Sequence, residues 1–222
     1  MQVEWYGQSA FRLSDGERTI VIDPFDVAAF AGRGPVRWDY PAIDGVTADL
    51  LLVTHEHGDH NAVGVVGGDP AVVRSRAGTH DTPLGTVVGV ASEHDEAAGT
   101  ERGHNVMYVF HFGGRRVAHL GDLGQRELRP EQAAALGTVD LLFVPVGDGV
   151  TIGAEQAIDV AATLSAKVIV PMHYRTERID FLEPVDAFVE QARRVTRLDA
   201  PSFTVEDVAS DESPVVVVPA AP

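Results

Sequence analysis

The sequence predicts an α/β protein, α+β in its early part, built from two mixed β-sheets that face each other with helices outside. Short strand-like runs dominate the first half, and βαβ-like alternation follows later. No linker, repeat or low-complexity tract divides the chain. With 222 residues, 45% of them hydrophobic, the chain can bury a sizeable core. We therefore expect one domain spanning residues 1–222.

The first half of the chain reads as strands and turns. Three short runs separated by Gly or Asp-Gly predict an antiparallel meander: QVEWYG, AFRLSD and RTIVIDP. The continuous apolar run ADLLLVT predicts a strand buried on both faces. Further strands are expected in PAVVRS and GTVVGVAS. Residues 26–48, rich in Gly, Pro and Asp, favour a functional loop or a lid.

The second half adds a hairpin and helices. Gly113 and Gly114 can supply the positive φ angles of a tight turn between two β-rich runs, from Asn105 to Asp122. Buried strands are expected in VDLLFVPVG and KVIVPMH. Helices are expected in PEQAAALG, GAEQAIDVAATLSA and the amphipathic segment PVDAFVEQARRVTR. The runs SFTVE and PVVVVP predict late edge strands.

Composition excludes several kinds of function. The formal net charge of −16 disfavours a long nucleic-acid partner, because phosphate binding needs a basic surface. The chain has no cysteine, which excludes disulfides and thiolate ligands. Neither a signal peptide nor a membrane-spanning run is apparent. We expect a cytoplasmic protein with a small-molecule substrate and no membrane partner, and the hydrophobic edge strands permit a homo-oligomer.

The run THEHGDHN carries the strongest functional signal. It follows a buried strand and holds the pattern His55-x-His57-x-Asp59-His60. Imidazole nitrogen and carboxylate oxygen bind zinc, iron or manganese well. In a tight turn, His55 and His57 can share one ion, while Asp59 and His60 diverge towards a second ion. The alternative, a solvated polar turn, does not explain the downstream partners.

Three later residues can complete the two sites. His94, Asp122 and His173 each follow a predicted strand, and strand ends are where loops build sites. With these motifs, IDPF, THEHGDHN, EHD, HLGDLG and PMHY, the chain resembles the metallo-β-lactamase superfamily. It is most similar to small single-domain members, which include ascorbate-6-phosphate lactonase-like proteins and uncharacterised metal-dependent hydrolases.

The resemblance implies an αββα sandwich, the metallo-β-lactamase fold, with two metal ions at one edge. His55, His57 and His94 would bind the first metal. Asp59, His60 and His173 would bind the second, and Asp122 would bridge both. Two divalent ions, zinc or else manganese or iron, can lower the pKa of a shared water and so generate hydroxide at neutral pH. We expect hydrolysis of a small ester, lactone or phosphodiester.

Other residues are expected to support this chemistry. The predicted catalytic residues are Asp59, His173 and Tyr174, with Tyr174 donating to a developing oxyanion. Asp23 can fix the tautomer of a ligand histidine, or can simply be a turn residue before Pro24, and Thr54 can act as Asp23 does. Candidate substrate contacts are Arg33, Arg37, Trp38 and Arg175.

His119 is interpreted as a packed core histidine because it lies within a predicted hairpin strand. Two other functions fit the same ligands. One is a di-iron protein that handles oxygen or electrons, although no flavin-binding segment is apparent. The other is a non-catalytic module in which the metals only hold the edge of the sandwich together.

Overall fold

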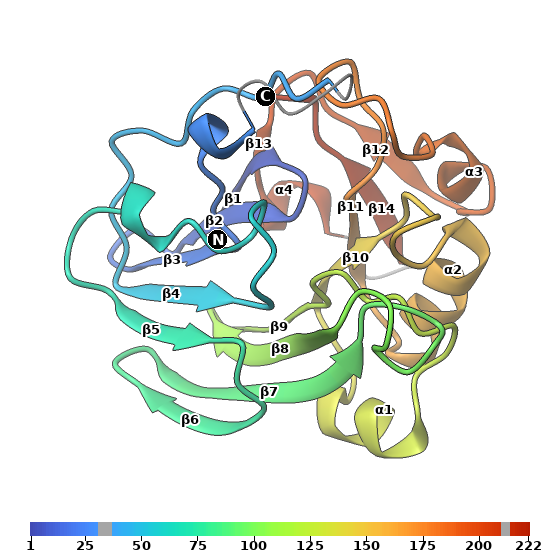
Figure 1. The fold of residues 1–222 in the computed structure, drawn as a ribbon, viewed down its shortest axis with the longest axis horizontal. Coiled ribbons are helices and arrows are strands. Elements are labelled where there is room, and N and C mark those ends of the chain that lie inside the picture. Colours follow the sequence, from blue (N-terminus) through green and yellow to red (C-terminus); the bar gives the residue numbers. More distant parts are fainter. Residues whose placement is uncertain (31–36, 210–213) are drawn as a thin grey trace.

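The computed structural model describes residues 1–30, 37–209 and 214–222, and in them two sheets face each other (Figure 1). The first sheet has the strand order β13-β1-β2-β3-β4-β5. Its strands are β1 Gln2–Gly7, β2 Ala10–Ser14, β3 Thr19–Ile22, β4 Leu50–Val53, β5 Ala71–Arg74 and β13 Ser202–Thr204. β1, β2 and β3 form the predicted antiparallel meander, while β3, β4 and β5 run parallel.

The second sheet has the order β12-β14-β11-β10-β9-β8-β7-β6. Its strands are β6 Gly78–Thr82, β7 Gly85–Glu93, β8 His104–Phe112, β9 Arg115–His119, β10 Leu141–Pro145, β11 Val168–Met172, β12 Val195–Arg197 and β14 Val215–Val218. Neighbours from β6 to β9 are antiparallel, and the other neighbours are parallel. β9, β10 and β11 therefore end at the same edge of this sheet.

The core lies between the two sheets. The rings of Phe11, from the first sheet, and Phe143, from the second, are 4.4 Å apart between centroids. β4 is buried on both faces, as its continuous apolar run predicts. Leu50 and Leu52 join the core between the sheets, and Leu51 packs on the outer face with Val21. Burying such side chains stabilises the fold by about 1.5–3 kcal/mol each.

Short helices complete the structure. They are α1 Pro130–Leu136, α2 Ala154–Thr163, α3 Asp186–Val189 and α4 Val205–Val208, with 3-10 turns η1 Val27–Ala29 and η2 Val63–Val65. α1 begins at a proline and is followed by Gly137, as predicted. α1, α2 and α3 lie along the outside of the second sheet (Figure 1). No helix in the described ranges is both long and apolar enough to cross a membrane.

Two expectations about the last forty residues are wrong. The amphipathic segment 184–197 forms only the short α3, followed by β12. The β-branched residues Val195 and Thr196 pair with β14, and this pairing competes with the helix. The run 215–218 is also not an edge strand, because β14 lies between β11 and β12. β13 does lie at an edge of its sheet.

The hairpin around Gly113 and Gly114 is confirmed. Both glycines have positive φ, 55° and 74°, and they join β8 to β9. This turn matters for the site because it returns the chain along β9 to Asp122. Of the predicted lid, residues 31–36 lie outside the described part of the chain, and a lid role for residues 26–48 stays a prediction.

Candidate metal centre

In the loop after β4, neighbouring side chains point in opposite directions. His55 is buried and turns inward, whereas Glu56 turns outward and accepts hydrogen bonds from Arg74 and from Ser75 Oγ. The backbone N–H of His60 donates to the carbonyl of His57 at 3.0 Å and closes the turn. The histidines of the motif are therefore gathered on one side of a tight loop, as the spacing predicts.

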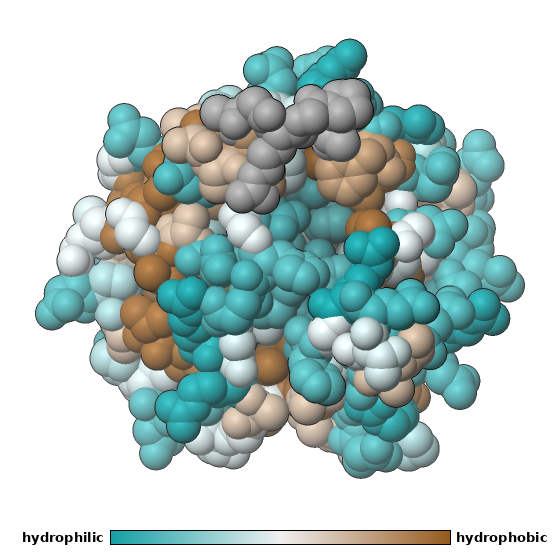
Figure 2. All heavy atoms as spheres, in the orientation of Figure 1, coloured by the Kyte–Doolittle hydropathy of each residue, from teal (hydrophilic) through white to brown (hydrophobic). Residues whose placement is uncertain are grey.

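The structure brings all seven predicted ligands together in two groups. Within each group, one candidate donor atom per residue lies within 4.8 Å of the others. The groups are His55, His57 and His94, and then Asp59, His60, Asp122 and His173. Five of the seven residues are buried, Asp59 is half-buried and His57 is exposed. The loop after β4 enters the middle of the view in Figure 1, and Figure 2 shows hydrophilic side chains gathered there.

Asp122 Oδ2 lies between the two groups. Its distances to the Nε2 atoms of the surrounding histidines are 3.2 Å for His60, 3.2 Å for His94, 3.3 Å for His173 and 3.7 Å for His55. His60 Nε2 is buried and has no hydrogen-bond partner among the described residues, despite its short distance to this oxygen. Four imidazole nitrogens thus converge on one carboxylate oxygen.

This convergence fits the donor set of a metal site. Zinc binds nitrogen and oxygen at about 2.0–2.2 Å, so two donors on one tetrahedral ion lie roughly 3.4 Å apart. The separations around Asp122 Oδ2, 3.2–3.7 Å, match that spacing. Asp59 Oδ2 lies 3.5 Å from His60 Nε2 and 3.8 Å from His173 Nε2, which also matches.

Asp23 and Thr54 orient two of the histidines. The Asp23 carboxylate accepts from Thr54 N at 2.7 Å, from Thr54 Oγ1 at 2.7 Å and from His60 Nδ1 at 2.9 Å. Because the Thr54 hydroxyl donates its proton to Asp23, it accepts from His55 Nδ1, 3.1 Å away. Both Nδ1 atoms therefore carry protons, and the Nε2 atoms of His55 and His60 face the centre.

Burial and charge act against each other in this cluster. Burial lowers the pKa of His55 to about 2, and neighbouring histidines add to the effect, so His55 is neutral. Burial also disfavours a charged His60, but Asp122, Asp59 and Asp23 outweigh it and raise the pKa of His60 well above its usual value. Burial raises the pKa of Asp122, but the surrounding histidines hold it well below its usual range.

Two supports of Asp122 carried no recognisable sequence signal. Asn105 Oδ1 accepts from the backbone N–H of Asp122 at 3.1 Å, while its Nδ2 donates to the carbonyl of Leu120 at 2.8 Å. Ser9, in the turn between β1 and β2, donates from Oγ to Asp122 Oδ1 at 3.3 Å. These contacts join residues far apart along the chain, so only the fold reveals them.

Two glycines let ligand segments pack closely. A Cβ on Gly124 would lie 2.3 Å from the carbonyl oxygen of His94, and one on Gly147 would lie 2.0 Å from the carbonyl oxygen of His173. Real side chains do not approach backbone so closely. Glycine is therefore required wherever these loops run past the main chain of His94 and His173.

Comparison with known proteins identifies the family. Residues 2–173 match the family model of the beta-lactamase superfamily domain. The chain belongs to the metallo-β-lactamase superfamily. A UPF0173 metal-dependent hydrolase of Heliobacterium modesticaldum is 31% identical over 209 residues, covering 79% of this chain and 83% of that protein. A second, of Thermus thermophilus, is 32% identical over 225 residues and covers 87% of this chain and 92% of its own length.

A solved structure of the same superfamily has a similar fold. The Thermotoga maritima protein is 35% identical, covers 98% of this chain and 97% of its own, and has a TM-score of 0.79. It was solved as a candidate Zn-dependent hydrolase of the metallo-β-lactamase superfamily. This confirms the fold expected from the motifs.

The other predicted site residues make contacts of their own, away from the seven predicted ligands. Tyr174 is buried and its ring packs against Trp5, 5.4 Å between centroids. Trp38 is half-buried, and its ring stacks on Phe30 at 3.9 Å. Arg37 donates to the carbonyl of Glu177 at 3.1 Å.

Arg175 and Arg33 complete that set. The Arg175 guanidinium lies 3.9 Å from Glu183, with about half of the side chain exposed. Arg33 lies outside the described residues. The substrate contacts and the catalytic role of Tyr174 stay predictions.

His119 is a core histidine, as predicted. It is fully buried, and its Nε2 donates to the carbonyl of Ser9 at 2.9 Å while its Nδ1 accepts from the backbone of Gly121 at 3.1 Å. Both ring nitrogens are satisfied, and burial lowers the pKa of His119, so the ring is neutral. This superfamily member thus uses His119 to join the β1–β2 turn to the second sheet.

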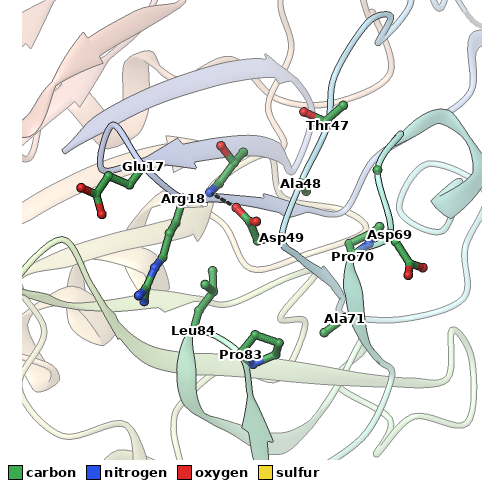
Figure 3. Close-up of a pocket in the computed structure, with 12 residues that line it drawn as sticks. Glu17, Arg18, Thr47, Ala48, Asp49, Asp69, Pro70, Ala71, Pro83 and Leu84 are labelled. Atoms are coloured by element: carbon green, nitrogen blue, oxygen red, sulfur yellow. Dashed lines mark hydrogen bonds between the residues drawn. The ribbon is translucent and has the colours of Figure 1, made fainter.

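Two pockets differ in their relation to the centre. One of about 420 Å³ is lined by His94, and its charged side chains are largely acidic: Asp95, Glu96, Glu101 and Asp148, with Arg102. Another of about 1040 Å³ lies at the starts of β3, β4 and β5 (Figure 3). The predicted ligands of the THEHGDHN motif follow the opposite end of β4. The larger pocket therefore lies away from the chemistry.

Proposed function

We propose that this protein is a metal-dependent hydrolase with a two-metal site. The observation that carries the proposal is the convergence of four imidazole nitrogens on Asp122 Oδ2, with Asp59 beside them. The names of the relatives support it, since both the Heliobacterium and the Thermus proteins are called metal-dependent hydrolases. Zinc is the proposed metal, with manganese and iron as the alternatives, because the donors are nitrogen and oxygen.

The proposed ligand assignment follows the two groups. His55, His57 and His94 would hold one ion, and Asp59, His60 and His173 the other, with Asp122 shared between them. Two divalent ions bound there would supply hydroxide from water at neutral pH and would polarise a carbonyl or phosphoryl group.

The chain's own groups prepare this centre before any substrate arrives. Asp23 and Thr54 keep protons on Nδ1 of His60 and His55, so the Nε2 atoms of both rings point inward, where a metal ion could displace any proton on them. Ser9 and Asn105 hold the Asp122 carboxylate and its backbone in place. In this proposal Asp59 and His173 touch the reacting centre.

We propose a small ester or lactone as the substrate, ahead of a phosphodiester. The pocket that His94 helps to line also carries several carboxylates and one arginine. This excess of negative charge repels an anionic group of a substrate. The net charge of −16 acts in the same direction against long nucleic acids. In the same proposal the protein is cytoplasmic, consists of one domain, has no membrane partner and can form a homo-oligomer.

The first test is elemental analysis by inductively coupled plasma mass spectrometry on untagged protein purified without added metal. We expect about two zinc or manganese ions per chain, followed by turnover of uncharged aryl esters or lactones. No bound metal, even after reconstitution, would overturn the proposal. Iron with visible absorption would favour the di-iron alternative, and bound metal without turnover on either substrate class would favour the non-catalytic module.

A further inference from the structure

Gln8 occupies an unusual position next to the candidate metal centre. It lies in the turn between β1 and β2, is fully buried, and has a positive φ of 49°. Its carbonyl accepts from Trp5 Nε1 at 2.9 Å and from the backbone N–H of His173 at 3.3 Å. The main chain of Gln8 is thus joined directly to a predicted metal ligand.

The side-chain amide of Gln8 has no hydrogen-bond partner among the described residues, although both Oε1 and Nε2 are buried. Burying an amide without hydrogen-bond partners is unfavourable, because the amide loses its bonds to water and gains none in return. Its neighbour in the same turn, Ser9, donates to Asp122, so within the β1–β2 turn only the Gln8 side chain lacks partners among the described residues. A polar side chain in this position calls for a partner inside the site.

His173 has the complementary group. Its Nε2 faces the two carboxylates, 3.3 Å from Asp122 and 3.8 Å from Asp59, while its buried Nδ1 has no partner in the described chain. A histidine that binds a metal through Nε2 carries its proton on Nδ1 and donates it to an acceptor. His55 and His60 have such acceptors in Thr54 and Asp23. His94 Nδ1 also lacks one, but Gln8 adjoins His173.

We propose that Gln8 is a positioning residue for His173. When the second group, which contains Asp59, His60 and His173, holds its ion, Gln8 Oε1 accepts the Nδ1–H of His173. The backbone hydrogen bond places the two side chains on adjoining main chain, and the three side-chain torsions of glutamine allow the amide to turn towards the ring. The inference rests on the metal-binding part of the proposed function.

The test compares Gln8→Leu, which removes the acceptor, with Gln8→Glu, which keeps one. Dissociation constants for the first and second equivalents of Zn²⁺ are measured by competition with a chromophoric chelator. We expect Gln8→Leu to weaken one equivalent by about 10–100-fold, the usual effect of losing such a partner. Gln8→Glu should restore binding, because its carboxylate accepts the same proton.

A matched control is Gln132→Leu. Gln132 is also a buried glutamine, but its amide is satisfied by Gln125, Arg129 and Ala91, away from His173. This variant loses stability while retaining the affinity of the equivalent that Gln8→Leu weakens. Melting temperatures of the metal-free variants separate general destabilisation from loss of a metal partner.

Each outcome decides between the two proposals. Wild-type zinc affinity in Gln8→Leu, or equal loss in Gln8→Leu and Gln8→Glu, would overturn the role of Gln8 and leave the proposed function standing. Failure of the wild-type protein to bind Zn²⁺ would instead overturn the proposed function.

If Gln8→Leu does not fold, nuclear magnetic resonance of histidine-labelled, zinc-loaded wild-type protein replaces it. We expect a slowly exchanging Nδ1–H of His173, whose chemical shift changes in Gln8→Glu. A signal that exchanges rapidly with water, or that stays unchanged in Gln8→Glu, would contradict the hydrogen bond.

Discussion

Asp23 shows how one buried carboxylate can organise a metal site without touching the metal. Three donors meet on it: Thr54 N–H, the Thr54 hydroxyl and His60 Nδ1. Through Thr54 its influence also reaches His55, which belongs to the other ligand group. A change at this residue should therefore affect both groups at once.

We predict that Asp23→Asn lowers the free energy of unfolding by about 2–4 kcal/mol and weakens zinc binding about 10–100-fold. An asparagine amide would present a donor to Thr54 or His60, so at least one buried donor would lose its acceptor. Chemical unfolding and zinc competition measure the two effects. Asp15→Asn is the matched control, because Asp15 accepts backbone N–H groups in an exposed turn. Equal effects in both variants would contradict this role.

The two ligand groups can be tested one residue at a time. We predict that His57→Ala loses an ion from the group with His55 and His94, and that Asp59→Ala loses an ion from the group with His60 and His173. Activity should fall at least 100-fold in each. Metal content and ester hydrolysis are measured on the same samples. Full activity in metal-free Asp59→Ala protein would show that the two-metal mechanism is wrong.

At the scale of elements, the loop after β4 is held by surface hydrogen bonds of Glu56 as well as by the buried hydrogen bonds of Asp23. Glu56 accepts from Arg74 Nε at 2.8 Å and from Ser75 Oγ at 2.7 Å, both at the end of β5. The hydrogen bonds from Arg74 come first among the causes that lower the pKa of Glu56 from 4.5 to about 2. The contact thus ties the ligand loop to the neighbouring strand.

We predict a pH-dependent stability difference between the wild-type protein and Glu56→Gln. Because folding lowers the pKa of Glu56, its contribution is complete above pH 4.5 and is lost as the pH falls from 4.5 towards 2. Both side chains are about half exposed, so the contribution at pH 7 is only about 0.5 kcal/mol. Urea unfolding at pH 7 and pH 3.5 measures it. A difference that grows on acidification, or that resists 1 M salt, would refute the assignment.

Sequence patterns predict most elements of this fold for identifiable reasons. β4 and the β8–β9 hairpin follow from a continuous apolar run and from paired glycines, both local signals. Residues 184–197 mislead because their helical spacing is overridden by pairing of β12 with β14, a contact fixed only in the folded chain. β6, Gly78–Thr82, escapes detection because its residues are mostly polar and exposed.

For the candidate site, too, local sequence signals are predictive and long-range contacts are not. All seven candidate ligands are recognisable because four of them share one local motif and the other three follow strands. Ser9, Asn105 and Gln8 are not recognisable, since each acts on a residue distant along the chain. Tyr174 is predicted from its place after His173, but the structure packs its ring against Trp5 in the core.

At the scale of the whole molecule, the ligands connect both sheets. The motif follows β4 of the first sheet, whereas His94, Asp122 and His173 follow β7, β9 and β11 of the second. Ions bound there would cross-link strands of the two sheets, in addition to the apolar core and to hydrogen bonds such as the one from His119 to Ser9. The free energy of metal binding would then appear as stability of the entire fold.

We predict that chelation of the metal lowers the melting temperature. Free zinc at about 1,000 times its dissociation constant stabilises the folded state by about 4 kcal/mol per site, roughly 8–16 °C for a chain of this size. Scanning calorimetry with and without a chelator measures the shift. The double variant His57→Ala, Asp59→Ala should show almost no response to chelator. An equal response in that variant would mean that the chelator acts elsewhere.

Gly124 and Gly147 lie against the backbone carbonyls of His94 and His173. The packing of the main chain at these two glycines therefore helps to set the distance between the ligand segments. A methyl group at Gly124 or Gly147 would overlap the backbone carbonyl of His94 or His173, so the whole ligand-bearing segment, not only a side chain, would have to shift. Ions of different radius demand different widths, so a change at either position would be expected to alter which metal the site accepts. Selectivity in this protein would then be tuned at residues that carry no donor atom at all.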